Sequence, residues 1–353
     1  MMTPSRSEPP RTRRRRRSAA HRRAAAVTIH DVARRAGVSV ATVSRVLNRK
    51  EIVREETSKV VLAAAKSLRY VPNIAARSLS IRRSQTVGIV LPDVHGEFFS
   101  EVIRGIDVAA RRGGYHILVS GSHSDVDEMI EVLEAMHGRV DGLVVMAPDV
   151  AIDSLREQLP RDLPMVLLNS SDERHPAITI DNYGGARMMM RHLSELGHTR
   201  IAFITGPATN ADARERLRGY RQAMRGLQRT EIGGDFTELA GHQAVEQILA
   251  LDPLPTAVFA ANDSMAVGAL SALRDAGIDV PGQMSVVGFD DVPIARYVNP
   301  PLTTIRVDIA ELGRRAFAVL LEVLAHPKSR IQRERIETTL IVRKSSGTQG
   351  ETS

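Results

Sequence analysis

The sequence predicts an α/β protein, in which a small all-α unit near the N-terminus precedes a core of two lobes built on doubly wound parallel sheets. From residue 85 onward, short apolar runs alternate with amphipathic stretches at about 25–35 residues per unit, the spacing of βαβ crossovers. Two successive sets of these units fit two lobes better than one very wide sheet. Residues 28–68 instead have the pattern of three short helices.

Length and composition exclude several classes of protein. The chain has 353 residues, 43% hydrophobic and 25% charged, enough for two to three domains of about 100–150 residues with buried cores. It has no cysteine, so disulfide frameworks, thiolate zinc sites and cysteine nucleophiles are excluded. No apolar run approaches the roughly 18–20 residues of a membrane span, and no signal-peptide apolar region follows the basic start. We therefore expect a soluble, cytoplasmic protein.

The formal net charge of +7 is unevenly distributed. Residues 1–26 hold nine arginines against a single acid, Glu8, so this segment carries all of the excess positive charge. It has no periodic apolar pattern, and we expect a disordered tail. The tail is either a polyanion-binding arm that adds non-specific affinity for DNA or a solvated extension that lies upstream of the true start.

Residues 27–69 have the pattern of a helix-turn-helix unit, with helices expected over 28–36, 40–47 and 55–68. Only Gly37, Val38 and Ser39 separate the first two helices. Gly37 can take the left-handed conformation that the turn requires, and Thr28 and Ser39 are placed to cap the two helices. Ala33 is small where the second helix crosses the first. The shared core is expected to contain Val32, Ala36, Val38, Val43 and Val46.

The exposed side of the second helix then carries residues suited to reading DNA. The N-terminal residues of such a helix reach base edges in the major groove. Arg45 can bind guanine through two hydrogen bonds, and Val40 and Ala41 can pack on thymine methyl groups. The side chains suited to phosphate contacts are Ser39, Thr42, Ser44 and Asn48. The alternative is an ordinary helical hairpin with a polar outer face.

This segment, the third helix and the stretch Tyr70-Val-Pro-Asn-Ile-Ala-Ala-Arg-Ser-Leu79 together resemble the DNA-binding headpiece of the LacI/GalR family of bacterial transcription regulators. The resemblance implies that residues 70–84 are a hinge that folds into a helix on operator DNA, with Leu79 inserted into the minor groove. An apolar wedge unstacks one base step, and the resulting bend recovers that cost through added contacts. Packing within a helix is the alternative for Leu79. The expected DNA contacts are Thr28, Ser39, Val40, Ala41, Thr42, Ser44, Arg45, Asn48, Arg77, Ser78 and Leu79.

The remainder of the chain resembles the two-lobed periplasmic-binding-protein-like core of the same family. The matching stretches include Leu91-Pro-Asp-Val, Ile180-Asp-Asn182, Leu196-Gly-His198, Ala261-Asn-Asp-Ser-Met-Ala266, Val287-Gly-Phe-Asp-Asp291 and Pro300-Pro-Leu-Thr-Thr-Ile305. Strands are expected over 87–91, 116–120, 142–146, 165–169, 201–205, 256–260 and 285–289. Helices are expected over 98–112, 125–137, 183–196, 215–224, 263–276 and 309–324. The core is then 85–345, with an N-lobe of about 85–181 and 308–335, a C-lobe of about 182–307 and 336–345, and a disordered tail at 346–353.

In such a core a ligand lies between the lobes, at the carboxyl ends of the parallel strands. Asp93, Asn262 and Asp290 all follow apolar strand runs. The resemblance implies further effector contacts: Phe98 and Phe99 would stack on the ligand, Arg216 would donate hydrogen bonds, Phe236 would pack from the second lobe, Asn262 and Asp290 would fix polar groups, and Asn210 and Asp212 would tune selectivity. The alternatives are core packing for the phenylalanines and helix capping for Asp93 and Asp263. The connection 226–235 is shorter than is usual in the family.

The resemblance implies a ligand-responsive transcription regulator, a repressor that binds a palindromic operator as a homodimer and a sugar or related metabolite as effector. It implies no cofactor and no metal, and a place in the cytoplasm on the nucleoid. The chain lacks an apolar heptad tail after residue 343, so a dimer is expected rather than a tetramer. A two-fold protein reads a palindrome through two recognition helices about one DNA turn apart.

Other functions fit the sequence less well. Phosphate-binding, dinucleotide-binding, nucleophile-elbow and zinc-protease motifs are absent, and the adjacent acids Asp290 and Asp291 should point apart at a strand end. We therefore expect no enzyme. A solute receptor of the periplasmic-binding type is the alternative, but an export signal is absent and residues 28–79 precede the core. A stand-alone nucleoid protein would explain the basic tail but not the core.

Overall fold

The structure is a computed structural model that describes residues 27–47, 53–70, 84–150, 163–170, 172, 174–327 and 330–349. Its contacts divide the chain into two compact units, Met1–Ser80 and Ile81–Ser353. The expected tail 1–26, the phosphate contact Asn48 and the hinge residues Arg77, Ser78 and Leu79 lie outside the described residues. No helix in the described ranges is long and apolar enough to cross a membrane.

The described residues of the first unit, 27–47 and 53–70, form three helices, α1 (Ile29–Ala36), α2 (Val40–Leu47) and α3 (Glu55–Ser67). Thr28 and Asp31 form a capping box at the start of α1, in which each side chain bonds to the other residue's backbone N–H. Gly37 ends α1 in the left-handed conformation, with φ of 67°. The Ser39 Oγ accepts a hydrogen bond from the Thr42 backbone N–H at 3.1 Å. The predicted caps and turn are confirmed, and Val32, Val43 and Val61 form the buried centre of the unit.

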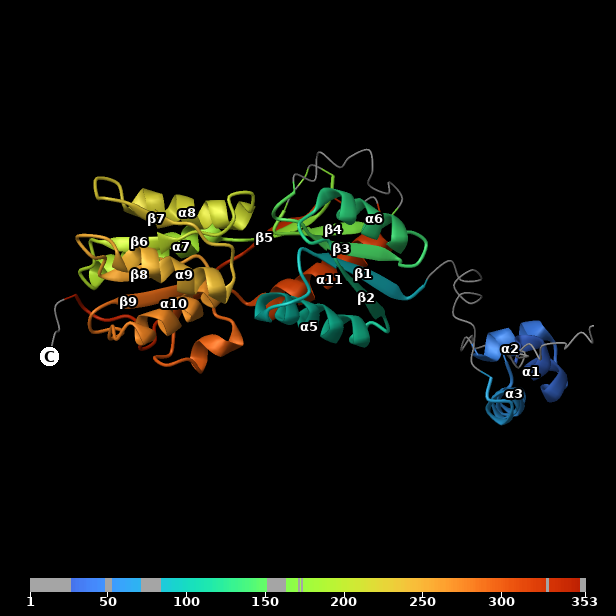
Figure 1. Ribbon diagram of the computed structural model, residues 1–353. Coiled ribbons are helices and arrows are strands. Elements are labelled where there is room, and N and C mark those ends of the chain that lie inside the picture. The colour runs from blue at the N-terminus through green and yellow to red at the C-terminus, as the bar shows by residue number, and fades with distance from the viewer. Residues whose placement is uncertain are drawn as a thin grey trace, which may run out of the picture. The chain divides into compact units, whose positions relative to one another are not determined.

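The second unit contains two six-stranded sheets (Figure 1). The first has the order β11-β5-β4-β3-β1-β2, and all of its pairs are parallel. Two helices, α5 and α11, pack together on one face, and α6 covers the other. The bounds are β1 (Thr86–Leu91), α5 (Glu97–Arg112), β2 (His116–Gly121), α6 (Val126–Met136), β3 (Gly142–Met146), β4 (Met165–Leu168), β5 (Ala177–Ile180), α11 (Ile309–Ala325) and β11 (Arg333–Ile336).

The second sheet has the order β12-β10-β9-β8-β6-β7 and is parallel except for the β10–β12 pair. Its helices pair as α7 with α8 and α9 with α10. The chain passes between the sheets after β5, after β10 and after β11, so each lobe is built from separate segments (Figure 1). The bounds are α7 (Asn182–Glu195), β6 (Ile201–Ile204), α8 (Ala211–Ala223), β7 (Thr230–Ile232), α9 (Glu238–Leu249), β8 (Ala257–Ala260), α10 (Asp263–Asp275), β9 (Ser285–Asp290), the 3-10 helix η2 (Pro293–Arg296), β10 (Thr303–Arg306) and β12 (Thr339–Ile341).

Five strands and one helix were not predicted from the sequence. The strands β5, β7, β10, β11 and β12 have only three or four residues each, and every one contains a threonine or a charged residue. The predicted strands β4, β6 and β8 are as short but entirely apolar. β11 reads Arg-Glu-Arg-Ile and is an edge strand, so its composition resembles a loop. Helix α9 has no long apolar stripe, and α8 begins four residues before the expected start at 215.

The expected disordered tail at 346–353 is wrong for residues 346–349. The Gly347 carbonyl accepts a hydrogen bond from the His198 side chain at 3.0 Å, and the Gly347 N–H donates to Ser285 Oγ at 3.0 Å. The Gln349 N–H donates to the Leu196 carbonyl at 2.9 Å. This segment is short and polar, and these bonds to the second lobe explain its order better than apolar burial does. Residues 350–353 lie outside the described ranges.

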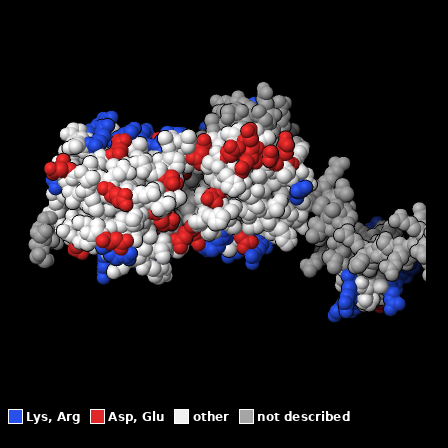
Figure 2. Space-filling model, in the orientation of Figure 1, with Lys and Arg blue, Asp and Glu red and all other residues white. Residues whose placement is uncertain are grey.

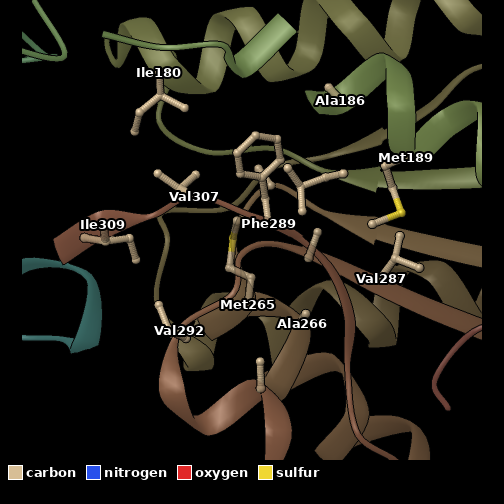
Figure 3. Packing of buried hydrophobic residues seen from close by; sticks show 14 of the residues in the cluster. Ile180, Ala186, Met189, Met265, Ala266, Val287, Phe289, Val292, Val307 and Ile309 are labelled. Carbon is tan, nitrogen blue, oxygen red and sulfur yellow. The ribbon is translucent and has the colours of Figure 1, made fainter. Parts of the chain in front are cut away.

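Buried side chains from both lobes form one hydrophobic cluster. Figure 3 shows Phe289 from β9 beside Val307 from the segment that leaves β10, with Met265 from α10 close by. Val292 and Ile309 extend this packing to the connection between the lobes. Close packing in this cluster holds the carboxyl ends of the strands in place. The polar residues of the site follow directly after these strand ends.

Glycines allow the paired helices to approach closely. A Cβ atom at Gly241 of α9 would collide with the Met265 backbone carbonyl of α10, and one at Gly105 of α5 would collide with the Ala310 carbonyl of α11.

A Gly241→Ala protein should therefore lose about 3 kcal/mol of unfolding free energy, because the backbones cannot move apart without opening the core. Urea denaturation measures this loss. Gly233→Ala is the control, since nothing lies within 4 Å of its Cβ position, and equal stability of the two variants would contradict the prediction.

Candidate functional site

A cavity of about 560 Å³ opens between the two lobes, beside the carboxyl ends of β1, β3, β8 and β9. Both lobes contribute to its lining, and Figure 2 shows a hollow between them in the same place. All nine residues expected to bind an effector lie in the lining: Asp93, Phe98, Phe99, Asn210, Asp212, Arg216, Phe236, Asn262 and Asp290. The structure therefore brings together residues that lie up to two hundred positions apart in the sequence.

The first lobe supplies aromatic rings from the start of α5. The Phe98 and Phe99 rings are 5.7 Å apart in an edge-to-face arrangement, and both pack partly against the core while lining the cavity. The Asp93 carboxylate accepts a hydrogen bond from the His95 backbone N–H at 2.9 Å, and this bond lowers the pKa of Asp93. Asp93 does not cap a helix, because Gly96 occupies the N-cap position of α5. The capping alternative for Asp93 is wrong.

Arg216 of α8 is the central buried cation of the site, with only 3% of its surface exposed. Its Nη2 pairs with Asp290 Oδ1 at 2.9 Å, its Nε donates to Asn182 Oδ1 at 2.8 Å, and its Nη1 donates to the Ala261 carbonyl at 2.6 Å. The guanidinium also lies 3.9 Å from the centre of the Phe289 ring. These contacts hold the guanidinium in one orientation, so Arg216 acts as a structural support for the lining as well as a candidate effector contact.

Two carboxyl groups beside Arg216 have raised pKa values. Burial raises the pKa of Asp212 to about 7, although the positive charge of Arg216 opposes the shift. Burial also raises the pKa of Asp290, again opposed by Arg216. The Asp212 Oδ1 accepts a hydrogen bond from Asn182 Nδ2 at 2.7 Å. Perturbed carboxyl groups gathered in a cavity are typical of ligand-binding sites.

The adjacent acids point apart, as predicted from a strand end. Whereas Asp290 faces Arg216, the buried Asp291 carboxylate accepts hydrogen bonds from Arg306 Nε at 2.6 Å and Arg343 Nη2 at 2.5 Å. Arg306 ends β10, directly before the chain crosses to α11, whereas Arg343 follows β12 in the second lobe. Asp291 is therefore held by arginines of its own lobe and forms no part of the cavity lining.

Several lining residues have strained backbone conformations. The φ angles of Asn169, Phe236 and Asp290 are 51°, 76° and 111°, in the left-handed region that non-glycine residues rarely adopt. Asn262 holds one of them in place, since its Nδ2 donates to the Phe236 carbonyl at 3.0 Å. The Asn262 Oδ1 also caps α10 through the Met265 N–H. Asn262, rather than Asp263, is therefore the helix cap, and the capping alternative for Asp263 is wrong.

Three further residues belong to the site but were not predicted. Asn182 bridges Arg216 and Asp212, and Asn169 lines the cavity at the end of β4. Glu97 spans the lobes, because its Oε2 accepts a hydrogen bond from the Ile294 N–H at 2.9 Å. Asn169 could have been found by the rule that located Asp93, since it ends the apolar run 165–169. The roles of Asn182 and Glu97 depend on hydrogen bonds to residues far away in the sequence, which no local sequence pattern predicts.

The candidate DNA-reading surface lies on the first unit. Arg45 and Ala41 are exposed on α2, while Val40, Thr42 and Ser44 are half-buried. The Thr42 hydroxyl hydrogen-bonds to the Ser39 hydroxyl at 2.8 Å, so both side chains are oriented at the start of α2. Figure 2 shows Lys and Arg side chains on the described part of this unit. Thr28, the remaining predicted DNA contact in this part, is exposed and caps α1.

A two-lobed core whose cavity is lined by aromatic and hydrogen-bonding side chains, preceded in the same chain by a helix-turn-helix unit, defines a class of ligand-binding regulators of transcription. Residues 28–73 match the family described as bacterial regulatory proteins, lacI family, and residues 190–346 match the periplasmic binding protein-like domain. The HTH-type transcriptional repressor PurR of Haemophilus influenzae is 36% identical over 330 residues, which is 90% of this chain and 98% of that protein. The chain belongs to the lacI family of bacterial regulatory proteins.

Solved structures agree with this assignment. The chain is similar to the Lac repressor dimer bound to operator and the anti-inducer ONPF, with a TM-score of 0.84 and 32% identity over 91% of this chain and 99% of that one. It is also similar to a LacI family transcriptional regulator from Enterococcus faecium with bound ribose, with a TM-score of 0.69 and 26% identity over 75% of this chain and 99% of that one. The predicted family and fold class are confirmed.

Proposed function

We propose that the protein is an effector-responsive repressor that binds a palindromic operator as a homodimer, works in the cytoplasm on the nucleoid, and has neither enzymatic activity nor a cofactor. The observation that carries the proposal is that one chain combines a helix-turn-helix unit with a cavity lined by all nine expected effector residues. The cavity residues are engaged in holding one another, as in the Arg216–Asp290 pair, rather than in activating a nucleophile. The dimer bound to operator in the Lac repressor structure supports the same assembly here.

The effector would act by shifting the balance between arrangements of the lobes. Hydrogen bonds join the lobes near the cavity. Glu97 accepts one from the Ile294 N–H, the Ala211 N–H donates to the Pro148 carbonyl at 2.9 Å, and the Asn169 amide bonds to the Asp212 carboxyl group. A ligand that touches both lobes binds one arrangement more tightly, and only this difference in affinity can change the state of the protein. Coupling of about 1–3 kcal/mol between effector and operator is typical of such systems. Residues 70–84, which connect α3 to β1 in the chain, would carry this change to the helix-turn-helix unit.

Arg45 is proposed as the principal base-reading side chain, and Arg45→Ala should lower operator affinity by about 1–3 kcal/mol while relaxing the base preference at one position. Selection of operator sequences from a random DNA library, with wild type and variant in parallel, measures both effects. Arg35→Ala is the matched control, because Arg35 is an exposed arginine on α1 rather than α2. If the variant selects the same DNA motif as wild type, Arg45 does not take part in base recognition.

The same selection tests the proposed function as a whole. The full chain should enrich a palindromic sequence, and a small neutral sugar should change its affinity for that sequence. The sugar assignment is supported by the mixed lining of aromatic rings and hydrogen-bonding side chains, and by the ribose in the Enterococcus faecium structure. Failure to enrich any sequence, or sedimentation as a monomer at working concentration, would contradict the proposal.

A further inference from the structure

The cavity is strongly acidic for its size. Seven carboxylate side chains are in its described lining: Asp93, Glu97, Asp149, Asp212, Asp235, Glu238 and Asp290. Arg216 is the one lysine or arginine among the described lining residues, and it is already paired with Asp290. Figure 2 shows Asp and Glu side chains on both lobes beside the hollow. The imidazoles of His95 and His123 are hydrogen-bonded to carboxylates, those of Asp93 and Glu128.

Most of these carboxylates are bound by neutral groups rather than by cations. Asp149 accepts a hydrogen bond from the Ser124 hydroxyl, Asp235 from Thr237, and Glu238 from the Ser264 hydroxyl. Glu97 accepts one from a backbone N–H. Across the described residues, none of these four forms an ion pair with lysine or arginine. Neutral donors orient a carboxylate but leave its charge in place, so the cavity keeps an excess of negative charge.

An unsatisfied acceptor lies among the carboxylates. Asn169 is only 4% exposed and lines the cavity, and its Oδ1 is the one buried side-chain polar atom without a hydrogen-bond partner in the described part of the chain. A buried carbonyl oxygen without a donor is costly. The amide of Asn169 also bonds to the Asp212 carboxyl group, so the orphan oxygen and this carboxylate lie at the same place in the cavity.

This combination selects the chemistry of the ligand. Asn169 Oδ1 only accepts hydrogen bonds, and the carboxylate oxygens of Asp212 and Asp290 do the same once ionised. Burial raises the pKa of both acids, but a bound cation favours their ionised form, so a group that meets all three oxygens must donate. An ammonium group has three donors and a positive charge, and its bonds to carboxylates are stronger than those of a neutral hydroxyl. The rings of Phe98, Phe99 and Phe236 offer faces that also attract a cation.

We propose that the effector is an amine-bearing polyol, such as an amino sugar, whose ammonium group donates hydrogen bonds to Asn169, Asp212 and Asp290, and that phosphorylated and acidic sugars are rejected. This inference rests on the proposed function, because it names the chemistry of the ligand for the same cavity. Neutral sugars should still bind this cavity, but amine-bearing ones should bind it more tightly. An anionic sugar would be repelled by the carboxylates around the cavity. Arg216, the one arginine in the described lining, is already paired with Asp290 and would not compensate this repulsion.

The experiment is calorimetric titration of the purified full chain with matched sugars at pH 7 and low ionic strength. Glucose, glucosamine, N-acetylglucosamine, glucose 6-phosphate and gluconate form one series, and the galactose and mannose series repeat it with other stereochemistry. Within whichever of the three series contains sugars that bind to the protein, the amino sugar should bind at least tenfold more tightly than the parent sugar. The N-acetyl derivative should lose this advantage, because acetylation removes the charge. The phosphate and the acid should bind at least tenfold more weakly than the parent.

A variant then assigns the preference to the cavity. Asp212→Asn keeps the shape of the side chain but removes its charge, and the ratio of amino-sugar to parent affinity should fall to within threefold of unity. Equal binding of amino and parent sugars to wild type, or binding of the phosphate as tight as that of the parent, overturns the inference while leaving the proposed repressor intact. If no compound binds although the chain still selects an operator, the polyol assignment itself is wrong and the inference falls with it.

Discussion

Replacing Arg216 with alanine should lower the free energy of unfolding by about 3–5 kcal/mol, because the substitution leaves the buried Asp290 carboxylate without its cation. The loss extends beyond the ion pair. Asn182 Oδ1 and the Ala261 carbonyl also lose their donor, and the face of Phe289 loses the guanidinium that covers it. Unfolding in urea, followed by far-UV circular dichroism, measures this change. The response to effector should be lost as well, since the lining no longer has a fixed geometry.

The variant Arg216→Met with Asp290→Asn separates the ion pair from the packing. If the unpaired charge is the main cost, the double variant should recover more than half of the stability lost by Arg216→Met alone. The asparagine has no charge that would be left buried without a partner. The helix-turn-helix unit forms a separate compact unit, so binding to non-specific DNA at low salt should persist in all three proteins. A stability of Arg216→Ala within 1 kcal/mol of wild type would show that the pair is not a support of the fold.

The sequence located much of the site because its residues follow simple local rules. Asp93, Asn262 and Asp290 end apolar strand runs, and the carboxyl ends of parallel strands meet at one edge of a sheet. The short strand β8 and the longer β9 both end in this way. The caps at Thr28 and Ser39 and the left-handed Gly37 were predictable for the same reason, since each depends on neighbours within four residues.

The remaining features depend on contacts between distant residues. Arg216 and Asp290 are 74 residues apart, and nothing in either segment indicates that they pair. Glu97 and the Ile294 N–H meet only because two lobes are built from interleaved segments. The charged edge strand β11 is a strand because it pairs with β5, not because of its own composition. The order of residues 346–349 likewise depends on His198 and Ser285.

Asp212 provides a second large effect, and its sign depends on pH. The pKa of this carboxyl group rises from 3.8 to about 7 on folding, because burial disfavours the charged form. Between pH 4 and pH 7, in round terms, the folded state keeps a proton that the unfolded state has released, so stability falls as pH rises through this window. Asp212→Asn removes the titration. It should therefore stabilise the protein at pH 8 and have progressively less effect toward pH 4.

A rise of the pKa from 3.8 to about 7 corresponds to roughly 4 kcal/mol. Solvent access to this partly buried side chain should reduce the gain at pH 8 to about 2 kcal/mol. Thermal unfolding of wild type and variant from pH 5 to pH 8 measures the change. Asp93→Asn is the control with the opposite sign, because the hydrogen bond from His95 lowers the pKa of Asp93. Its loss should weaken the protein slightly and by the same amount from pH 5 to pH 8, because the folded pKa of Asp93 lies below this range. A gain from Asp212→Asn that does not vary with pH would mean that packing, not charge, is responsible.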